Sequence, residues 1–184
     1  WVCTFNHTSA SCSPSVAGKL NMSISGARLL ETDLATDLAL IELSLKPLVE
    51  WRVQYAGWDR SGQIPKHVTS LHHPGGDVQK IAHYGMSPLH GSWTGNLTWR
   101  VPSWDIGTTE TGTLGAPLFD EYKRVIGWFT AGGNNCENAG SPDHFAKFNN
   151  AWSKLKKYLD PFNQGMTSVD GFYPGFDQVD QEII

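Results

Sequence analysis

Several features that would indicate a particular class of protein are scarce or absent in this sequence. It holds only three cysteines, Cys3, Cys12 and Cys136, and because this number is odd they cannot all pair with one another. No stretch approaches the ~18 consecutive apolar residues of a membrane span, so we expect no membrane-spanning segment. No block of lysine and arginine suggests binding to nucleic acid.

Charge is also low, because charged residues make up 17% of the chain and the net charge is only -4. The chain has 19 glycines, 10 prolines and 8 tryptophans in 184 residues, with no internal repeat. This composition suits an all-β protein with many turns better than a helical bundle. The length allows one sizeable domain, or one and a half small ones.

The chain begins Trp1-Val2-Cys3, with neither a methionine nor a signal peptide, so we expect it to be part of a longer precursor. Three sequons make Asn6, Asn21 and Asn96 candidates for glycosylation. Together with a few cysteines placed in loops, they predict a secreted, extracellular protein in an oxidising setting.

Strands are predicted where apolar and aromatic residues alternate with polar ones or form short runs between turn signals. These segments are residues 1–8, 19–31, 36–43, 51–58, 68–71, 80–84 and 124–133, and the region 88–105 is loop and strand.

A single helix is predicted near the end, where apolar residues recur at helical spacing and lysines occupy the outer side. Its apolar positions are Phe145, Phe148, Trp152, Leu155 and Leu159. We therefore predict a domain over residues 1–162, followed by a C-terminal extension or linker over residues 163–184.

The most informative stretch is Thr109 to Asp120, which contains the frame Gly-x-x-Gly-x-Pro before an apolar strand. Glycines on both sides let the backbone turn sharply and bring amide N–H groups together. In such a loop those donors bind an oxyanion, and the residue between them supplies an attacking hydroxyl group. Here that residue is Leu114, which has no hydroxyl group. Taken alone, the stretch is also compatible with a simple hairpin turn.

A second site is the segment Thr36 to Leu43, in which Asp37 stands just ahead of a dense apolar run. A vicinal pair, His72-His73, could bind a metal, but adjacent residues of a strand point to opposite faces and no third ligand has a fitting spacing. We predict no metal site, and no pattern indicates a cofactor.

The order of these segments resembles one family, the lysyl endopeptidases, a branch of the trypsin-like serine proteases. The matching motifs include Thr36 to Leu43, Leu71-His72-His73-Pro74, Thr109 to Phe119, Arg124 to Gly133 and Ser141-Pro142-Asp143. The resemblance implies a trypsin-like double β-barrel with a C-terminal helix, incomplete in this chain.

The resemblance also implies roles for single residues. Asp37 is similar to the triad aspartate, with a structural aspartate in a turn as the alternative. Gly112, Thr113 and Gly115 form the oxyanion loop. For the substrate pocket, Asp143 corresponds to the aspartate that binds a substrate lysine, and Thr130 stands where the family has a histidine. Either Trp93 or Trp99 takes the place of the binding-site tryptophan.

Several positions depart from the family pattern. Leu114 replaces the nucleophile, Ala116 replaces a small polar residue, and the segment with the catalytic histidine is absent. Cys12 and Cys136 match family cysteines whose partners lie in that absent segment, and a Cys3–Cys12 disulfide is an alternative. We therefore expect the N-terminal strands to come from a cleaved companion chain or from a stretch outside this sequence.

Three functions remain open from the sequence. The first is a non-catalytic protease homologue that serves as a structural or partner-binding domain, in which Leu114 fills the oxyanion cavity. The second is an active lysyl endopeptidase, if Leu114 is not the native residue. The third is a non-cleaving binder of basic side chains through Asp143.

Overall fold

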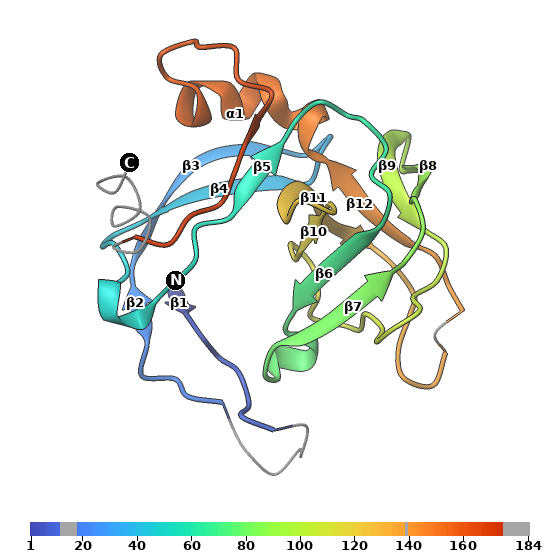
Figure 1. Cartoon of the computed structure of the whole chain (residues 1–184), viewed down its shortest axis with the longest axis horizontal. Helices are drawn as coiled ribbons and strands as arrows, with labels where there is room; N and C mark the ends of the chain where they lie inside the picture. Colours follow the sequence, from blue (N-terminus) through green and yellow to red (C-terminus); the bar gives the residue numbers. More distant parts are fainter. Residues whose placement is uncertain (12–17, 139, 175–184) are drawn as a thin grey trace, which may run out of the picture.

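Most of the chain forms antiparallel β-strands joined by turns, with one short helix near the end (Figure 1). The computed structural model describes residues 1–11, 18–138 and 140–174. The predicted all-β class with a C-terminal helix is confirmed. The strands are β1 Val2–Thr4, β2 Ser23–Ser25, β3 Ala27–Asp33, β4 Leu38–Leu43, β5 Gly57–Asp59, β6 Val68–His72, β7 Lys80–Tyr84, β8 Leu89–Trp93, β9 Asn96–Val101, β10 Pro117–Phe119, β11 Arg124–Ala131, β12 Asp143–Lys147 and β13 Ser168–Val169, and the helix is α1 Trp152–Leu159.

The largest sheet has the strand order β7-β6-β10-β11-β12-β9-β8, with β5 paired to β11 and β13 paired to β5. Its core contains Trp99, Leu118, Phe129 and Phe145, all of them buried. The Trp99 indole N–H donates to the Ile126 carbonyl across 3.2 Å, so this buried polar group is satisfied. This buried core holds together the strands from which the loops extend.

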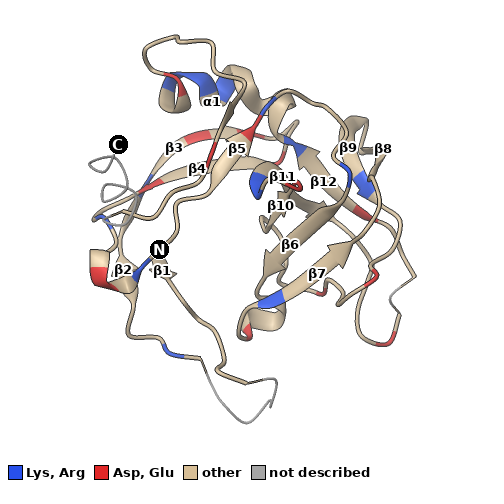
Figure 2. Cartoon of the chain, viewed as in Figure 1, with Lys and Arg blue, Asp and Glu red and all other residues tan. Residues whose placement is uncertain are grey.

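The helix begins later than the sequence pattern predicted. Phe145 lies on β12, opposite Phe129 of β11, and their rings meet edge to face with centroids 5.3 Å apart. A short 3-10 turn, Phe148–Ala151, then leads into α1. The helix turns Leu155 into a second apolar cluster and carries lysines on its outside (Figure 2).

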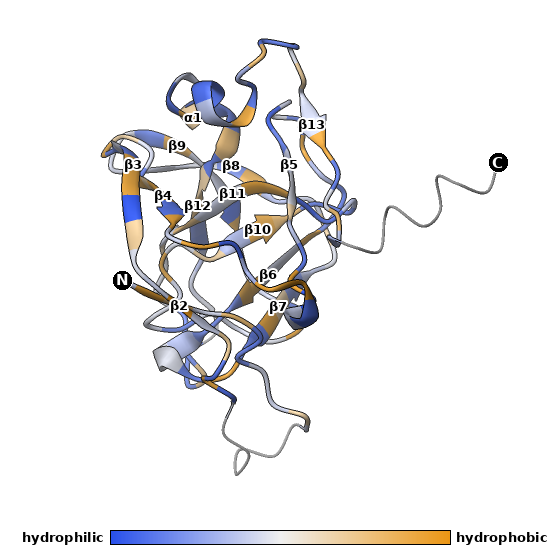
Figure 3. Cartoon of the chain, turned by 90° about the vertical axis from the view of Figure 1, so that its left-hand side faces the viewer, coloured by the Kyte–Doolittle hydropathy of each residue, from blue (hydrophilic) through white to orange (hydrophobic). Residues whose placement is uncertain are grey.

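The N-terminal third of the chain forms two separate two-stranded sheets, β1–β2 and β3–β4. Gly26, with φ +96°, divides the predicted strand over residues 19–31 into β2 and β3. Among the described residues no barrel closes and neither outer edge of the β3–β4 hairpin is paired. Figure 3 colours much of β1 and part of β3 as apolar, and Val2 and Leu29 on these strands are exposed.

No helix in the described part of the chain is long and apolar enough to cross a membrane.

Candidate functional site

The loop before β10 is held in a tight turn by its own backbone. The Thr113 N–H donates to the Glu110 carbonyl (3.1 Å), and the Ala116 N–H donates to the Thr113 carbonyl (2.9 Å). Gly112 and Gly115 have φ values of +96° and +81°, which residues with a Cβ rarely adopt. The two glycines thus permit the sharp turn that the sequence predicted.

The loop also rests on the turn that follows β6. The Gly75 N–H donates to the Thr111 carbonyl across 2.7 Å, and a Cβ on Gly112 would lie 2.7 Å from the Gly75 nitrogen. Only glycine leaves room for this close approach of two backbones. The His72-His73-Pro74 segment is therefore a support for the loop.

Leu114 lies in this loop, and its side chain is 69% exposed. The expectation that it fills the oxyanion cavity was wrong, because the loop directs it into solvent. Among the described residues, no acceptor binds the N–H groups of Gly112 or Leu114. The loop therefore has free donors but no side chain that could attack a carbonyl group.

Thr113, the neighbouring hydroxyl group, is buried beneath the loop and is 1% exposed. Its Oγ1 lies 3.1 Å from His72 Nδ1 and accepts a hydrogen bond from the Glu110 N–H at 3.2 Å. Burial lowers the pKa of His72 below its ordinary value, and the nearby His73 lowers it further. This is a hydroxyl–imidazole pair, but its burial keeps it from a substrate, so it anchors the loop.

Asp37 lies in the turn between β3 and β4, with φ +52° and an exposed side chain. Its Oδ2 accepts a hydrogen bond from the Thr130 hydroxyl group at 2.6 Å. The Trp128 indole N–H also donates to the carbonyls of Thr36 (2.9 Å) and Asp37 (3.1 Å). These contacts fix the turn against β11. In the described part of the chain, no histidine forms a hydrogen bond or ion pair with Asp37.

The structure brings together three residues that the sequence assigned to two different roles. Asp37, Thr130 and Trp93 line one small cavity of about 30 Å³. Trp93 is half exposed and packs on the His144 ring, with centroids 5.6 Å apart. Thr130, predicted as a pocket residue, is thus the direct hydrogen-bond partner of Asp37, the residue predicted as the triad aspartate.

Asp143 lies apart from this cavity and is fully buried. Its Oδ2 accepts hydrogen bonds from the Trp104 indole (2.7 Å) and the Thr109 hydroxyl group (2.6 Å), and its Oδ1 accepts one from the Asn134 amide (2.9 Å). Burial raises the pKa of Asp143 above its ordinary value, and the three hydrogen bonds oppose this shift.

Gly132 packs directly against this carboxyl group. No larger residue fits there, because a Cβ would overlap with Asp143 Oδ1. No pattern in the sequence indicates the three donors Trp104, Thr109 and Asn134. Their polar side chains stand in loops, and only the fold shows that they converge on one carboxyl group. These three donors supply the hydrogen bonds of the buried Asp143 carboxyl group, and all three belong to this chain.

The three predicted glycosylation candidates differ in their surroundings. Asn6 and Asn21 are both exposed, and the Asn6 amide also donates to the Trp51 carbonyl at 2.7 Å. Asn96 lines the small cavity near Asp37. In its sequon Thr98 is buried, with its Oγ1 2.9 Å from His144 Nδ1.

Cys3 and Cys136 are free thiols, and Cys12 lies outside the described residues. The described part of the chain shows no disulfide.

Comparison with known proteins places this geometry in context. A family model described as "Lysyl endopeptidase, C-terminal domain" matches residues 1–146. Among solved structures, an inactive mutant form of Rv3671c from M. tuberculosis H37Rv is 18% identical, covering 81% of this chain and 70% of its own, with a TM-score of 0.46. The active form of the Rv3671c protease is 19% identical, with coverages of 71% and 57% and a TM-score of 0.44.

The apo form of the MamO protease domain from Magnetospirillum magneticum is 12% identical. The match covers 73% of this chain and 68% of that chain, with a TM-score of 0.43.

Proposed function

Because this chain belongs to the lysyl endopeptidase family and has the trypsin-like fold, we propose that it is a non-catalytic serine protease homologue that acts by binding a protein partner. The observation that supports this proposal is Leu114, which occupies the nucleophile position in an otherwise well-formed loop. A hydrocarbon side chain cannot form an acyl intermediate. Loss of the serine of a triad costs on the order of a millionfold in turnover.

The direct test is hydrolysis of lysyl peptide substrates by the purified full chain, with a lysyl endopeptidase as the positive control. We expect no turnover and no covalent adduct with a fluorophosphonate probe. Turnover that the probe blocks would show that the domain is an enzyme. Sequencing the gene at codon 114 then decides the second candidate, because a serine codon there restores the nucleophile.

The geometry gives less support to a binder of basic side chains through Asp143. That carboxyl group is fully buried and already accepts three hydrogen bonds. A lysine side chain would have to displace these donors and enter a closed site. Titration of the full chain with N-acetyl-lysine amide tests this directly, and we expect no saturable binding.

We place the partner on the N-terminal third of the molecule. The β3–β4 hairpin has unpaired outer edges among the described residues, and Leu34 at its turn is 99% exposed. Unpaired strand edges bind further strands. The proposed partner is a companion polypeptide whose strands extend this hairpin, in an extracellular setting that the exposed Asn21 sequon favours. Co-purification of a second polypeptide from the native source, lost when Leu29 is replaced by Asp, tests this.

A further inference from the structure

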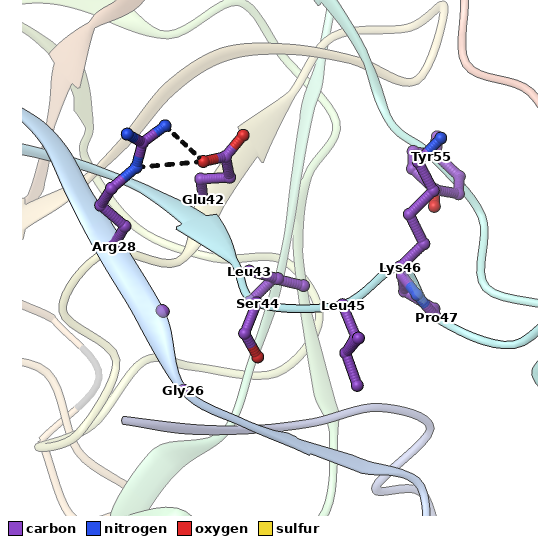
Figure 4. A pocket seen from close by; sticks show the side chains of 10 residues that line it. Gly26, Arg28, Glu42, Leu43, Ser44, Leu45, Lys46, Pro47 and Tyr55 are labelled. Carbon is purple, nitrogen blue, oxygen red and sulfur yellow. Dashed lines mark hydrogen bonds and ion pairs between the residues drawn. The ribbon is translucent and has the colours of Figure 1, made fainter.

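Groups without a partner occur both at the surface and in the interior of the described structure. At the surface, a groove of about 860 Å³ beside Leu43 and Leu45 (Figure 4) lies at the end of the molecule where the companion strands are proposed to bind. In the interior, Ser70 Oγ and His72 Nε2 are buried atoms with no hydrogen-bond partner among the described residues. The interior atoms are the less expected of the two, because buried polar groups are nearly always hydrogen-bonded.

His72 connects β6 to the loop over residues 109–116 (the Leu114 loop). It is the last residue of β6, it is 1% exposed, and its Nδ1 lies 3.1 Å from the hydroxyl oxygen of Thr113. That oxygen also accepts the Glu110 N–H at 3.2 Å. A threonine hydroxyl group has one proton and two lone pairs. A neutral His72 therefore satisfies the contact, because the hydroxyl group donates to an unprotonated Nδ1 and still accepts from Glu110.

Protonation of His72 disturbs this arrangement. Both ring nitrogens of an imidazolium are donors, so Nδ1 can no longer accept the hydroxyl proton of Thr113. The other donor, Nε2, has no acceptor among the described residues, and a positive charge in a buried site is costly. Burial accordingly lowers the pKa of His72 below its ordinary value of 6.5.

The charged groups around His72 offset this cost only in part. The adjacent His73 lowers the pKa of His72 further, whereas the Glu110 carboxylate raises it. Lys80, the register partner of His72 on β7, forms an ion pair with Asp77 at 3.3 Å. No residue of β10 or of the 3-10 turn after β6 titrates. Among the described groups that act on His72, only Glu110 thus favours its charged form.

The Leu114 loop, and not β6, is the side of this contact that is free to move. β6 pairs with a strand on both edges, with β7 and with β10. The middle of the loop contacts the chain beneath it through the His72–Thr113 bond and through the Gly75 N–H, which donates to the Thr111 carbonyl. Loops with few such contacts open locally at a lower free-energy cost than global unfolding.

We propose that His72 is a pH-sensitive contact that holds residues 110–114 in place while it is neutral and releases them when it takes up a proton. In the opened loop the imidazole reaches water and binds a proton more tightly than in the closed one. The closed loop therefore loses stability as the pH falls below about 6.5. The proposal does not depend on whether the domain is catalytic or on which partner it binds.

Amide hydrogen exchange of the full chain, followed by NMR at about pH 7.5 and about pH 5 and corrected for the intrinsic rate at each pH, tests this. The Thr113 and Ala116 amides are reporters, because both donate to carbonyls inside the loop. We expect their protection to fall by about tenfold or more at the lower pH. Amides of β12, which is paired on both edges, should change by less than about twofold.

Two substitutions distinguish His72 from other titrating groups. His72→Gln keeps a side chain that forms hydrogen bonds but does not titrate, so its loop amides should differ by less than about twofold between the two pH values. The matched control, His73→Gln, removes the neighbouring histidine and should keep most of the difference seen in the parent chain. A difference in His72→Gln as large as in the parent overturns the proposal. An equal loss of protection in the loop and in β12 also overturns it.

A measurement on the parent chain does not require either variant to fold. NMR of the ring nitrogens in chain labelled with 15N-histidine follows the protonation of His72 across the pH range. We expect proton uptake by His72 and the loss of loop protection to have the same midpoint. Loss of protection while His72 stays neutral overturns the proposal, and so does a protonated His72 beneath a loop that is still protected.

Discussion

The hydroxyl group of Thr130 donates a 2.6 Å hydrogen bond to the carboxylate of Asp37 and so joins β11 to the turn between β3 and β4. The turn belongs to a small separate sheet, whereas β11 is central in the large one. This contact and the bonds from Trp128 therefore join the hairpin turn to the large sheet, in addition to the attachment of β3 to α1 through the hydrogen bond from Tyr158 to the Leu30 carbonyl.

Removing this hydroxyl group should loosen the hairpin. We expect Thr130→Val to lower the free energy of unfolding by about 1 kcal/mol, since the bond involves a charged acceptor but lies near solvent. Urea denaturation measures this loss. Thr130→Ser keeps the hydroxyl group and should lose less. Equal losses in both variants would mean that the methyl group, and not the hydrogen bond, stabilises this contact.

Mutation should affect the free energy of unfolding strongly at one position of the loop and very little at its neighbour. Thr113→Val leaves the buried His72 and the Glu110 N–H without a partner, so we expect a loss of about 1–3 kcal/mol in the free energy of unfolding. Leu114→Ala removes an exposed side chain and should change it by less than about 0.5 kcal/mol. Thermal or urea unfolding of both variants provides the comparison, and a larger effect at Leu114 would contradict the assignment of the inner and outer sides of the loop.

The two glycines of the loop offer a matched pair. Gly112 and Gly115 both have positive φ, so alanine pays a similar conformational cost of about 1–2 kcal/mol at either position. A Cβ at Gly115 meets nothing within 4 Å, whereas one at Gly112 meets the Gly75 backbone. We expect Gly112→Ala to be the more destabilising change by at least about 1 kcal/mol. Equal losses in denaturant unfolding would show that the loop can move away from Gly75.

The all-β class and the loop glycines could be predicted from the sequence because both depend on local properties of the backbone. The start of the helix could not be predicted from the sequence. Phe145 and Phe148 fit a helical spacing, but they also suit the strand and the turn that they occupy. Packing against Phe129 of the neighbouring strand decides between the two.

Side-chain contacts between distant segments were least predictable. The sequence placed Thr130 in a pocket with Asp143, yet the structure pairs it with Asp37, which lies 93 positions away along the chain. The burial of Asp143 likewise depends on three donors from separate loops. No local pattern specifies such a convergence.

The buried carboxyl group of Asp143 predicts how stability depends on pH. Because burial raises its pKa in the folded state above the ordinary value of 3.8, the folded chain holds this proton more tightly than the unfolded chain does. The contribution to stability is fully present below the unfolded pKa and is lost as pH rises through the folded one. We therefore expect Asp143 to lower the free energy of unfolding progressively as pH rises above about 4.

Two variants make this pH dependence measurable. Asp143→Asn has no titrating group there, so its free energy of unfolding should not show this decline above about pH 4. Thr109→Val removes a hydrogen bond that favours the charged carboxylate, so it should raise the pKa of Asp143 and extend the decline to higher pH. Urea unfolding at a series of pH values gives all three curves. Parallel curves for the parent chain and Asp143→Asn would mean that other groups cause the pH dependence, because only the variant lacks this carboxyl group.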